Sequence, residues 1–539
     1  MAVQNIVYPM NSELFRKILR NKYFKLILFS SVFVLTSLIY NYQDIIRYRP
    51  ISMHQWRNCV SASIALNYYH EGEFFHPRTH NMQADKLSSD ITITEFPAIY
   101  YFIGMLYRIF GFHEYIYKLV NVLIGFTGLY FLFLLGLRNF RNYFYALIPP
   151  LVIFSSPIFV YYINNFIPDA TSLSIVFIGL YFFYLYYEKS RTRDFLLAMF
   201  FFAFAGLIKT PALLLFFATI GIFGLEWIFR VRFRKEQEIF RNKILAIAGF
   251  ISVLVLVVAW YAYAKIYTDE HGGVVSPVEL RPIWILSAET IRLTLDAIQE
   301  RVRTGNYLSQ VLIYLVFGMF VFNLVFWRKH NRLLSFLVLL SFIGGLCYSL
   351  LFFRSFRQHD YYMMNNLIFI VLVLFNFTIF LKEHLPQVYH SIITKLIIGS
   401  LSLLMIINCN TFLQKKYYGG WFMDYAIKTY NHKYGEITPY LRSLGIERMD
   451  KVYCTFDPSI NISLYLMDQK GFTDFYRKGQ AFSKNYQTFL EKGLKYVIIG
   501  NYETLDAQPE ELGLVKIGEY NSVGIYRVPS SENTSAPAT

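Results

Sequence analysis

The chain has 539 residues, of which 55% are hydrophobic and only 16% charged, a balance that excludes an ordinary water-soluble domain. Its formal net charge of +15 would suit a nucleic-acid-binding protein. The basic residues, however, lie in short loops between apolar runs, so membrane topology explains them better than a nucleic-acid partner does.

Residues 1–23 form a polar, basic N-terminal tail, and an apolar run follows from Phe24 to Tyr40. We interpret this run as an uncleaved first span with a cytoplasmic N-terminus, because no small-residue cleavage site follows it. Further apolar segments approach the length that crosses a hydrocarbon core. They cover residues 116–137, 143–163, 168–187, 194–208, 211–229, 244–266, 308–327, 333–352, 363–382 and 394–413. The sequence therefore predicts a polytopic α-helical membrane protein with about 11 transmembrane helices over residues 24–413.

Basic residues alternate between successive loops of this domain, and the loop from Arg230 to Lys243 is the richest in them. Under the positive-inside rule, the loops 42–115 and 267–307 then lie on the outer side. Tyr100–Phe110 is too short for a span, and we expect it to lie in the outer interface. The loop 267–307 contains an amphipathic stretch from Ala288 to Val302 and should be partly ordered.

Residues 414–529 have the composition of a soluble domain. Lys451–Phe456 and Lys495–Gly500 are predicted strands, and Leu514–Val528 is a predicted hairpin turning at Asn521-Ser522. Helical patterns lie around 421–444 and 484–493. We expect a small extracytoplasmic α/β domain, followed by a disordered tail at 530–539.

Polar residues near membrane spans are costly, so they need a reason to be there. Loop 54–97 carries His54, Arg57, Asp85, Asp90 and Glu95, which could supply a general base and cation sites. The alternative is a solvated loop packed by Trp56 and Phe96.

Three other polar groups lie at the outer ends of spans. Asp169 follows Pro168 and could either cap a helix or join a site. Lys209 lies in a break between two apolar runs, where it could snorkel or bind an anionic head group. The third group suits phosphate binding or an interfacial belt, and it comprises Arg354, Arg357, His359, Asp360, Tyr361 and Tyr362.

The sequence has no Walker loop, no Gly-x-Ser-x-Gly, no His-Glu-x-x-His and no dinucleotide-binding fingerprint, and its four cysteines lack metal-ligand spacing. A channel or transporter should carry polar positions through the middle of the membrane. Here they gather at one side, which favours an enzyme whose site opens outward.

The order of these motifs over about residues 20–380 resembles the GT-C class of lipid-dependent glycosyltransferases. The likeness is to the bacterial branch related to protein O-mannosyltransferases and lipid A aminoarabinose transferase. It is carried by His54-Gln-Trp-Arg57, Glu95-Phe-Pro-Ala-Ile-Tyr-Tyr101, Pro168-Asp169, Lys209-Thr-Pro211 and His359-Asp-Tyr-Tyr362. The resemblance implies an enzyme of the bacterial inner membrane. It would move a sugar from a polyprenyl-phosphate donor to a lipid, glycan or protein acceptor on the outer face. The class allows a divalent metal, although no ligand cluster in this chain argues for one.

The family usually has an Asp early in the first outer loop as catalytic base, whereas this chain has Asn58, Cys59 and Val60 there. His54 is a candidate for that place, and Asp44 and Asp90 are alternatives. We expect His54, Glu95 and Asp169 to be catalytic. The expected substrate-binding residues are Trp56, Arg57, Lys209, Arg354, Arg357, His359, Asp360, Tyr361 and Tyr362. The alternative functions are a lipid or polysaccharide transporter and an O-antigen-ligase-like enzyme.

Overall fold

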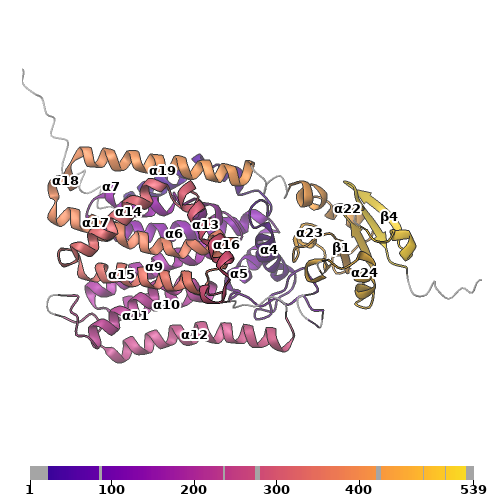
Figure 1. Ribbon diagram of the computed structural model, residues 1–539, viewed down its shortest axis with the longest axis horizontal. Helices are drawn as coiled ribbons and strands as arrows, with labels where there is room; N and C mark the ends of the chain where they lie inside the picture. Colours follow the sequence, from indigo (N-terminus) through magenta and orange to yellow (C-terminus); the bar gives the residue numbers. More distant parts are fainter. Residues whose placement is uncertain are drawn as a thin grey trace, which may run out of the picture.

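The structure is a computed structural model. It describes residues 22–83, 86, 88–234, 237–273, 280–419, 427–477, 479–503 and 505–529. The predicted loop residue Asp85 and the predicted tail 530–539 lie outside these ranges. A long helical bundle occupies one part of the molecule, and a small sheet domain lies at one end of it (Figure 1).

Within the described residues, seven helices are long and apolar enough to cross a membrane. They are α6 (Glu114–Phe140), α9 (Asp169–Lys189), η1 with α11 (Thr210–Leu213 and Leu214–Trp227), α12 (Lys243–Glu270), α15 (Arg332–Leu351), η4 with α17 (Asp360–Asn366 and Leu367–His384) and α19 (Ile392–Tyr418). Shorter apolar helices are α2 (Lys22–Ile39), α10 (Thr192–Ile208) and α14 (Gln310–Val325). The protein is thus an integral membrane protein, as predicted, while the number of helices that cross stays a prediction.

The predicted span 143–163 is two helices, α7 (Tyr143–Ile153) and α8 (Pro157–Ile163), bent by 76°. Pro149 and Pro150 lie inside α7, and Pro157 begins α8. Because proline has no backbone N–H, Pro157 cannot continue the ladder of α7 onto the carbonyl of Ile153. The apolar length of this segment agrees with the prediction, but the break between its two helices was not predicted.

Helix α9 lies at the centre of the bundle, where 83% of its apolar window is buried, and it packs against α6 and α10. Gly128 permits a close approach of α6, because an added Cβ would lie 2.8 Å from the Cα of Ser174 and collide with its carbonyl oxygen. In contrast, α19 runs along the outside of the bundle (Figure 1), and only 11% of its apolar window is buried.

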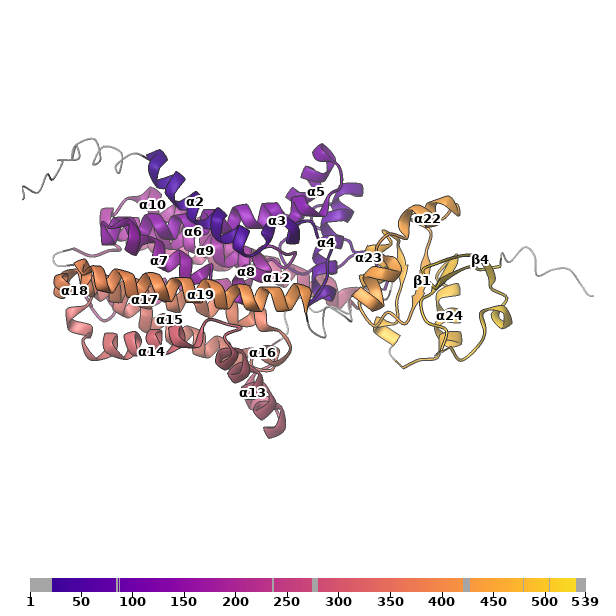
Figure 2. The same cartoon turned by 90° about the horizontal axis from the view of Figure 1, so that it is seen from above.

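Helices α4 (Gln55–His70) and α5 (Ala98–Phe110) lie between the bundle and the sheet domain (Figures 1 and 2). Other short elements connect the long helices, and they are α3 (Tyr42–Ile45), η2 (Ile283–Ile285), α13 (Ala288–Thr304) and α16 (Ser355–Gln358). The predicted amphipathic stretch corresponds to α13, which projects away from the bundle in Figure 2. At the opposite end the chain turns through η3 (Trp327–Lys329) and α18 (Pro386–His390).

The C-terminal domain is a five-stranded sheet with the order β2-β1-β3-β5-β4. Its strands are β1 (Val452–Thr455), β2 (Gly471–Phe472), β3 (Tyr496–Ile499), β4 (Val515–Tyr520) and β5 (Val523–Arg527). Strand β1 pairs in parallel with β2 and β3, whereas β5 pairs antiparallel with β3 and β4. This confirms the predicted small α/β domain, including the hairpin turn at Asn521-Ser522.

Helical segments flank this sheet. They are η5 (Ile427–Asn431), α21 (His432–Tyr434), α22 (Thr438–Ser443), α23 (Ile462–Leu466), η6 (Phe475–Arg477), α24 (Phe482–Leu490) and η7 (Pro509–Leu512). The predicted pattern at 421–444 is therefore three short pieces where the structure describes it, and residues 420–426 lie outside the described residues.

An interdomain interface joins the loop after α4 to the edge of β2. The amide of Met82 donates to the carbonyl of Gly471 over 2.7 Å, and the amide of Gly471 donates to the carbonyl of His80 over 3.1 Å. The buried ammonium of Lys470 bonds the Asp90 carboxylate and, at 3.0 Å, the Thr79 carbonyl. This interface holds the loop after α4 against the sheet domain, and α4 itself contacts α23 of that domain.

Candidate active site

Four charged side chains from distant segments meet near the sheet-domain end of the bundle, and we call them the Glu95 cluster. Arg57 of α4 bonds the carboxylate of Glu95, and Lys209 lies 3.0 Å from the same oxygen. Lys209 also lies 3.6 Å from the carboxylate of Asp169. The two carboxylates are buried and the two cations are partly buried, and their charges balance each other.

Local structure explains how these residues reach one another. Asp169 is the first residue of α9, directly after Pro168. Lys209 lies at the break between α10 and η1, and Pro211 follows it. The loop carrying Glu95 is held by Trp260, whose indole N–H donates to the Thr94 carbonyl over 3.1 Å, and by the Phe96 amide, which donates to Leu207.

The charges in the Glu95 cluster stabilise one another. Burial alone would raise the pKa of Glu95, but Arg57 and Lys209 outweigh burial and hold it well below its ordinary value. Burial alone would lower the pKa of Lys209, but Asp169 and Glu95 raise it well above its ordinary value. A carboxylate held ionised in this way is a weak proton acceptor, so Glu95 suits charge positioning better than general-base catalysis.

A second group, the Asp360 cluster, lies beside the first. The Asp360 carboxylate is fully buried at the start of η4 and accepts a hydrogen bond from the hydroxyl of Tyr162 in α8. It also pairs with Lys416 Nζ at 2.9 Å and with His54 Nε2 at 3.4 Å. We predicted a catalytic role for His54 together with Glu95 and Asp169, and in the structure the carboxylate that His54 approaches is that of Asp360.

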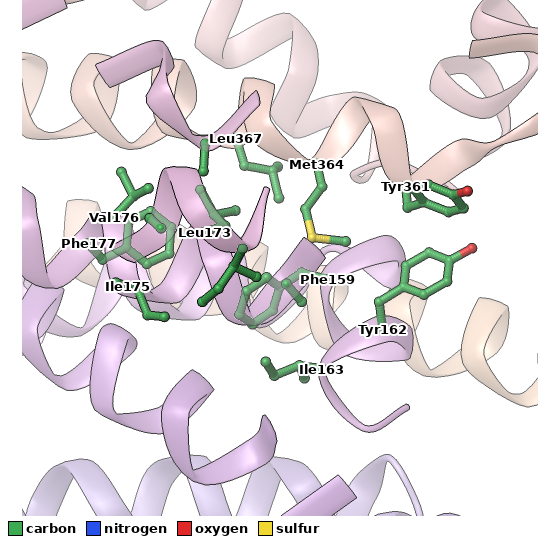
Figure 3. Close-up of a cluster of buried hydrophobic side chains, with 14 of the residues drawn as sticks. Phe159, Tyr162, Ile163, Leu173, Ile175, Val176, Phe177, Tyr361, Met364 and Leu367 are labelled. Carbon is green, nitrogen blue, oxygen red and sulfur yellow. The ribbon is translucent and has the colours of Figure 1, made fainter. Parts of the chain in front are cut away.

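Aromatic rings line this second group. The rings of His54 and His359 are 5.3 Å apart, and those of His54 and Tyr361 are 5.2 Å apart. Tyr162 and Tyr361 lie side by side at the edge of a buried apolar cluster, and both hydroxyls point away from it (Figure 3). Tyr362 contacts the ring of His359. Burial, then the neighbouring His54, lowers the pKa of His359 from 6.5 to about 3, so this ring is neutral at neutral pH.

The other predicted site residues lie apart from the two buried groups. Arg354 lies just before α16 and Arg357 lies on it, and both side chains are exposed. Trp56 is 37% exposed, and its ring packs on that of Phe475 of the sheet domain, with 4.7 Å between the ring centroids. The alternative base Asp90 pairs with Lys470 and Arg78 in the interdomain interface, and Asp44 is exposed on α3.

Sequence reasoning missed Lys416 and Tyr162. Lys416 follows Lys415 at the end of an apolar run, where basic residues ordinarily mark a membrane boundary. Tyr162 lies inside an apolar run, where aromatic residues are common. Neither position carries a local signal that separates it from its neighbours.

An apolar cavity of about 340 Å³ opens between α13, α14, α15 and η4–α17. Phe317, Phe320, Phe342, Phe369 and Met363 are among the residues that line it. Since η4 carries Asp360 and Tyr361 as well as Met363, one short element joins the cavity to the Asp360 cluster. Among the residues that the structure describes, no group of three or more His, Cys, Asp or Glu side chains is placed to hold a metal ion.

A protein-family model matches part of the chain. Residues 94–263 match the family model described as dolichyl-phosphate-mannose-protein mannosyltransferase. No curated protein sequence matches the chain significantly.

Solved structures are similar at low sequence identity. ArnT from Cupriavidus metallidurans in the apo state has a TM-score of 0.61 at 12% identity, covering 93% of this chain and 97% of that chain. The same protein bound to undecaprenyl phosphate has a TM-score of 0.59 at 11% identity, covering 94% and 98%. The apo oligosaccharyltransferase of Archaeoglobus fulgidus has a TM-score of 0.55 at 12% identity, covering 89% of this chain and 70% of that chain. The chain therefore shares the fold of these solved structures, which agrees with the GT-C fold that the motif order predicted.

Proposed function

We propose that the protein is a glycosyltransferase that moves a sugar from a polyprenyl-phosphate donor to a lipid, glycan or protein acceptor. The observation that carries this proposal is the juxtaposition of two buried charged clusters and an apolar cavity around η4. The GT-C fold and the binding of undecaprenyl phosphate by a structurally similar protein support it.

Each part of the arrangement meets a requirement of this reaction. The departing phosphate needs cations, for which we nominate Lys209 in the buried site and Arg354 and Arg357 at the exposed edge. The prenyl chain needs an apolar groove, which the cavity beside η4 supplies. The acceptor hydroxyl needs a base, and His54 is the candidate because cations hold Glu95 in its ionised form. Asp169 and Glu95 then position Lys209.

We also propose a location in the bacterial inner membrane, with a cytoplasmic N-terminus and the sheet domain on the periplasmic side. The alternation of basic loops supports this orientation. It places both charged clusters at the outer end of the bundle, where the donor head group and the acceptor would meet.

Mass spectrometry of cell-envelope lipids, glycans and glycoproteins, with and without the gene, tests the activity directly. We expect one class of molecule to lose a sugar when the protein is absent. Donor binding is measured separately in nanodiscs with undecaprenyl phosphate as the probe. Arg357→Ala should weaken binding by about 1.5–3 kcal/mol, the range for charge-assisted hydrogen bonds.

Arg357 is a clean target because its side chain is exposed, so its loss leaves the buried pairs intact. Lys265→Ala is the matched control, since Lys265 is exposed on α12 and pairs with Asp269 one turn further along the same helix. If the envelope lipids, glycans and glycoproteins are unchanged without the gene but the protein still binds undecaprenyl phosphate, the transporter alternative is favoured. If they are unchanged and the protein does not bind the lipid, the proposed glycosyltransferase function is contradicted.

A further inference from the structure

We propose that Asp360 is a positioning residue that orients His54 as the general base of the sugar transfer, with Lys416 and Tyr162 holding Asp360. This inference rests on the proposed function, and it gives Asp360 a role other than substrate binding. It also adds Lys416 and Tyr162 to the site.

The geometry around Asp360 carries this inference. Three groups from separate segments converge on one fully buried carboxylate: Tyr162 OH from α8 and Lys416 Nζ from α19 bond it, and His54 Nε2 at the start of α4 lies 3.4 Å from it. A buried carboxylate is retained only with such partners, because an unpaired one carries a large desolvation cost. The side chain of Lys416 is only 8% exposed, so its ammonium also depends on this pairing.

The imidazole of His54 lies against this carboxylate. Its Nε2 is buried without a hydrogen-bond partner among the described residues, and the Asp360 carboxylate is 3.4 Å away. In the proposed arrangement the neutral ring carries its proton on Nε2, toward Asp360, and leaves the lone pair on Nδ1. The rings of Tyr162, His359 and Tyr361 surround the imidazole at centroid distances of 6.2, 5.3 and 5.2 Å. The backbone of His54 is left-handed, with φ 58° and ψ 33°, a conformation that costs energy in a non-glycine residue and is common at functional sites.

The charges around His54 also suit a base. Among the described residues, the titratable groups that face it include the Asp360 carboxylate, the Lys416 ammonium behind that carboxylate, the neutral ring of His359, and the phenols of Tyr162 and Tyr361. Lys416 balances the charge of Asp360, so the carboxylate faces the imidazole as part of an ion pair.

In the transfer step, one proton moves to His54 and one bond at the anomeric carbon replaces another. The acceptor hydroxyl gives its proton to Nδ1 of His54 while its oxygen forms a bond to the anomeric carbon of the sugar. The bond between that carbon and the phosphate oxygen breaks, and its electron pair leaves with the polyprenyl phosphate. The imidazolium that forms is stabilised by Asp360, and it loses its proton to water afterwards.

Two variants separate this role from a merely structural one, because they act in opposite directions. Asp360→Asn removes the carboxylate and should move the acidic limb of the pH–rate profile to lower pH. Lys416→Gln leaves the carboxylate unbalanced and should move that limb to higher pH, in each case by about 1 pH unit. Asp360→Asn should also lower the rate on the order of 10- to 100-fold, with partial recovery in Asp360→Glu. Asp269→Asn, a change in an exposed carboxylate on α12, is the matched control.

The rates are measured in membranes from the deletion strain that carry each variant, using the product that envelope mass spectrometry identifies. A second readout needs no activity. Diethyl pyrocarbonate modifies unprotonated imidazole, and peptide mass spectrometry resolves His54 from His359. The pH midpoint of His54 modification should shift in the same two directions as the rate profile.

The two proposals fail in different ways. Opposite shifts in His54 modification without any envelope product would support the Asp360–His54 pairing and remove the proposed function. Midpoints that stay at the parent value in both variants would overturn the positioning role of Asp360, whatever the rates. If Asp360→Asn does not accumulate in membranes, Lys416→Gln and Tyr162→Phe, which keep the carboxylate, test the same pairing by the same midpoint.

Discussion

Acidification should weaken the interdomain interface, because His80 is buried in it as a neutral ring. Its side chain is fully buried, with Nδ1 2.6 Å from the Ser63 hydroxyl and Nε2 3.1 Å from Asp468. Burial lowers the pKa of His80 from 6.5 to about 4, and Asp468 offsets this only in part because Arg448 and Lys470 lie nearby. His80 therefore stays unprotonated while the domains are docked.

The size of the effect follows from linkage between protonation and docking. Since the pKa of His80 is lower in the docked state than in solvent, the undocked state binds the proton first as pH falls. Docking thus loses stability from about pH 6.5 downward, and the loss is complete below about pH 4. At pH 5 these two values correspond to about 2 kcal/mol, a shift of roughly 30-fold in the docking equilibrium.

Hydrogen exchange of the protein in nanodiscs measures this loss locally. The amides of Met82 and Gly471 donate across the interface, so their protection reports docking directly. Between pH 7.5 and pH 5, their opening free energy should fall by about 2 kcal/mol after correction for intrinsic exchange. The amides that pair β3 with β5 lie inside the sheet domain and provide the internal control.

A variant separates His80 from other titrating groups. Burial also lowers the pKa of His70, at the end of α4, so some acid sensitivity has a second source. His80→Asn should abolish most of the pH dependence while weakening docking at both pH values. The reasoning is refuted if Met82 and Gly471 keep their protection at pH 5, or if His80→Asn shows the same pH dependence as the parent.

Two further predictions concern topology and packing. Reporter fusions at Arg234 and at Gly435 should report the cytoplasm and the outside respectively, as the basic loops require, and the same side for both would contradict the proposed orientation. Gly128→Val should lower thermal stability by the equivalent of about 1–3 kcal/mol, because the new side chain collides with the backbone of Ser174, whereas Gly224→Ala in open space should not. Scanning fluorimetry in detergent compares the two, and equal melting temperatures would show that α6 and α9 can separate without cost.

The helices of the membrane domain could be predicted from the sequence, because the length of an apolar run and the charges that flank it are local features of the chain. Each predicted span coincides with a helix or with the α7–α8 pair. The bend between α7 and α8 was missed because hydropathy does not register it, although Pro149, Pro150 and Pro157 mark it. The sheet domain was found through its short β-rich runs, but its docking onto the loop after α4 depends on contacts between residues almost 400 positions apart.

The residues of the candidate site could be predicted from the sequence only in part. Arg57, Glu95, Asp169 and Lys209 stand out as charges beside apolar runs, and the structure brings them together. The pairing of His54 with Asp360 was not foreseen, because the start of α4 and the start of η4 are far apart in the sequence. Lys416 was missed for the opposite reason, since a basic residue at the end of a span is the ordinary pattern.

The length and exposure of α19 tie this site to the lipid around it. Its 27 residues span about 40 Å at 1.5 Å each, which exceeds a hydrocarbon core of about 30 Å. Such a helix adjusts to the surrounding bilayer by tilting, and α19 has few neighbours to resist the tilt. Its last turn carries Lys416 onto Asp360, so a change of tilt moves the ammonium relative to the carboxylate. Acyl-chain length in the host membrane thereby becomes a determinant of how the two groups meet.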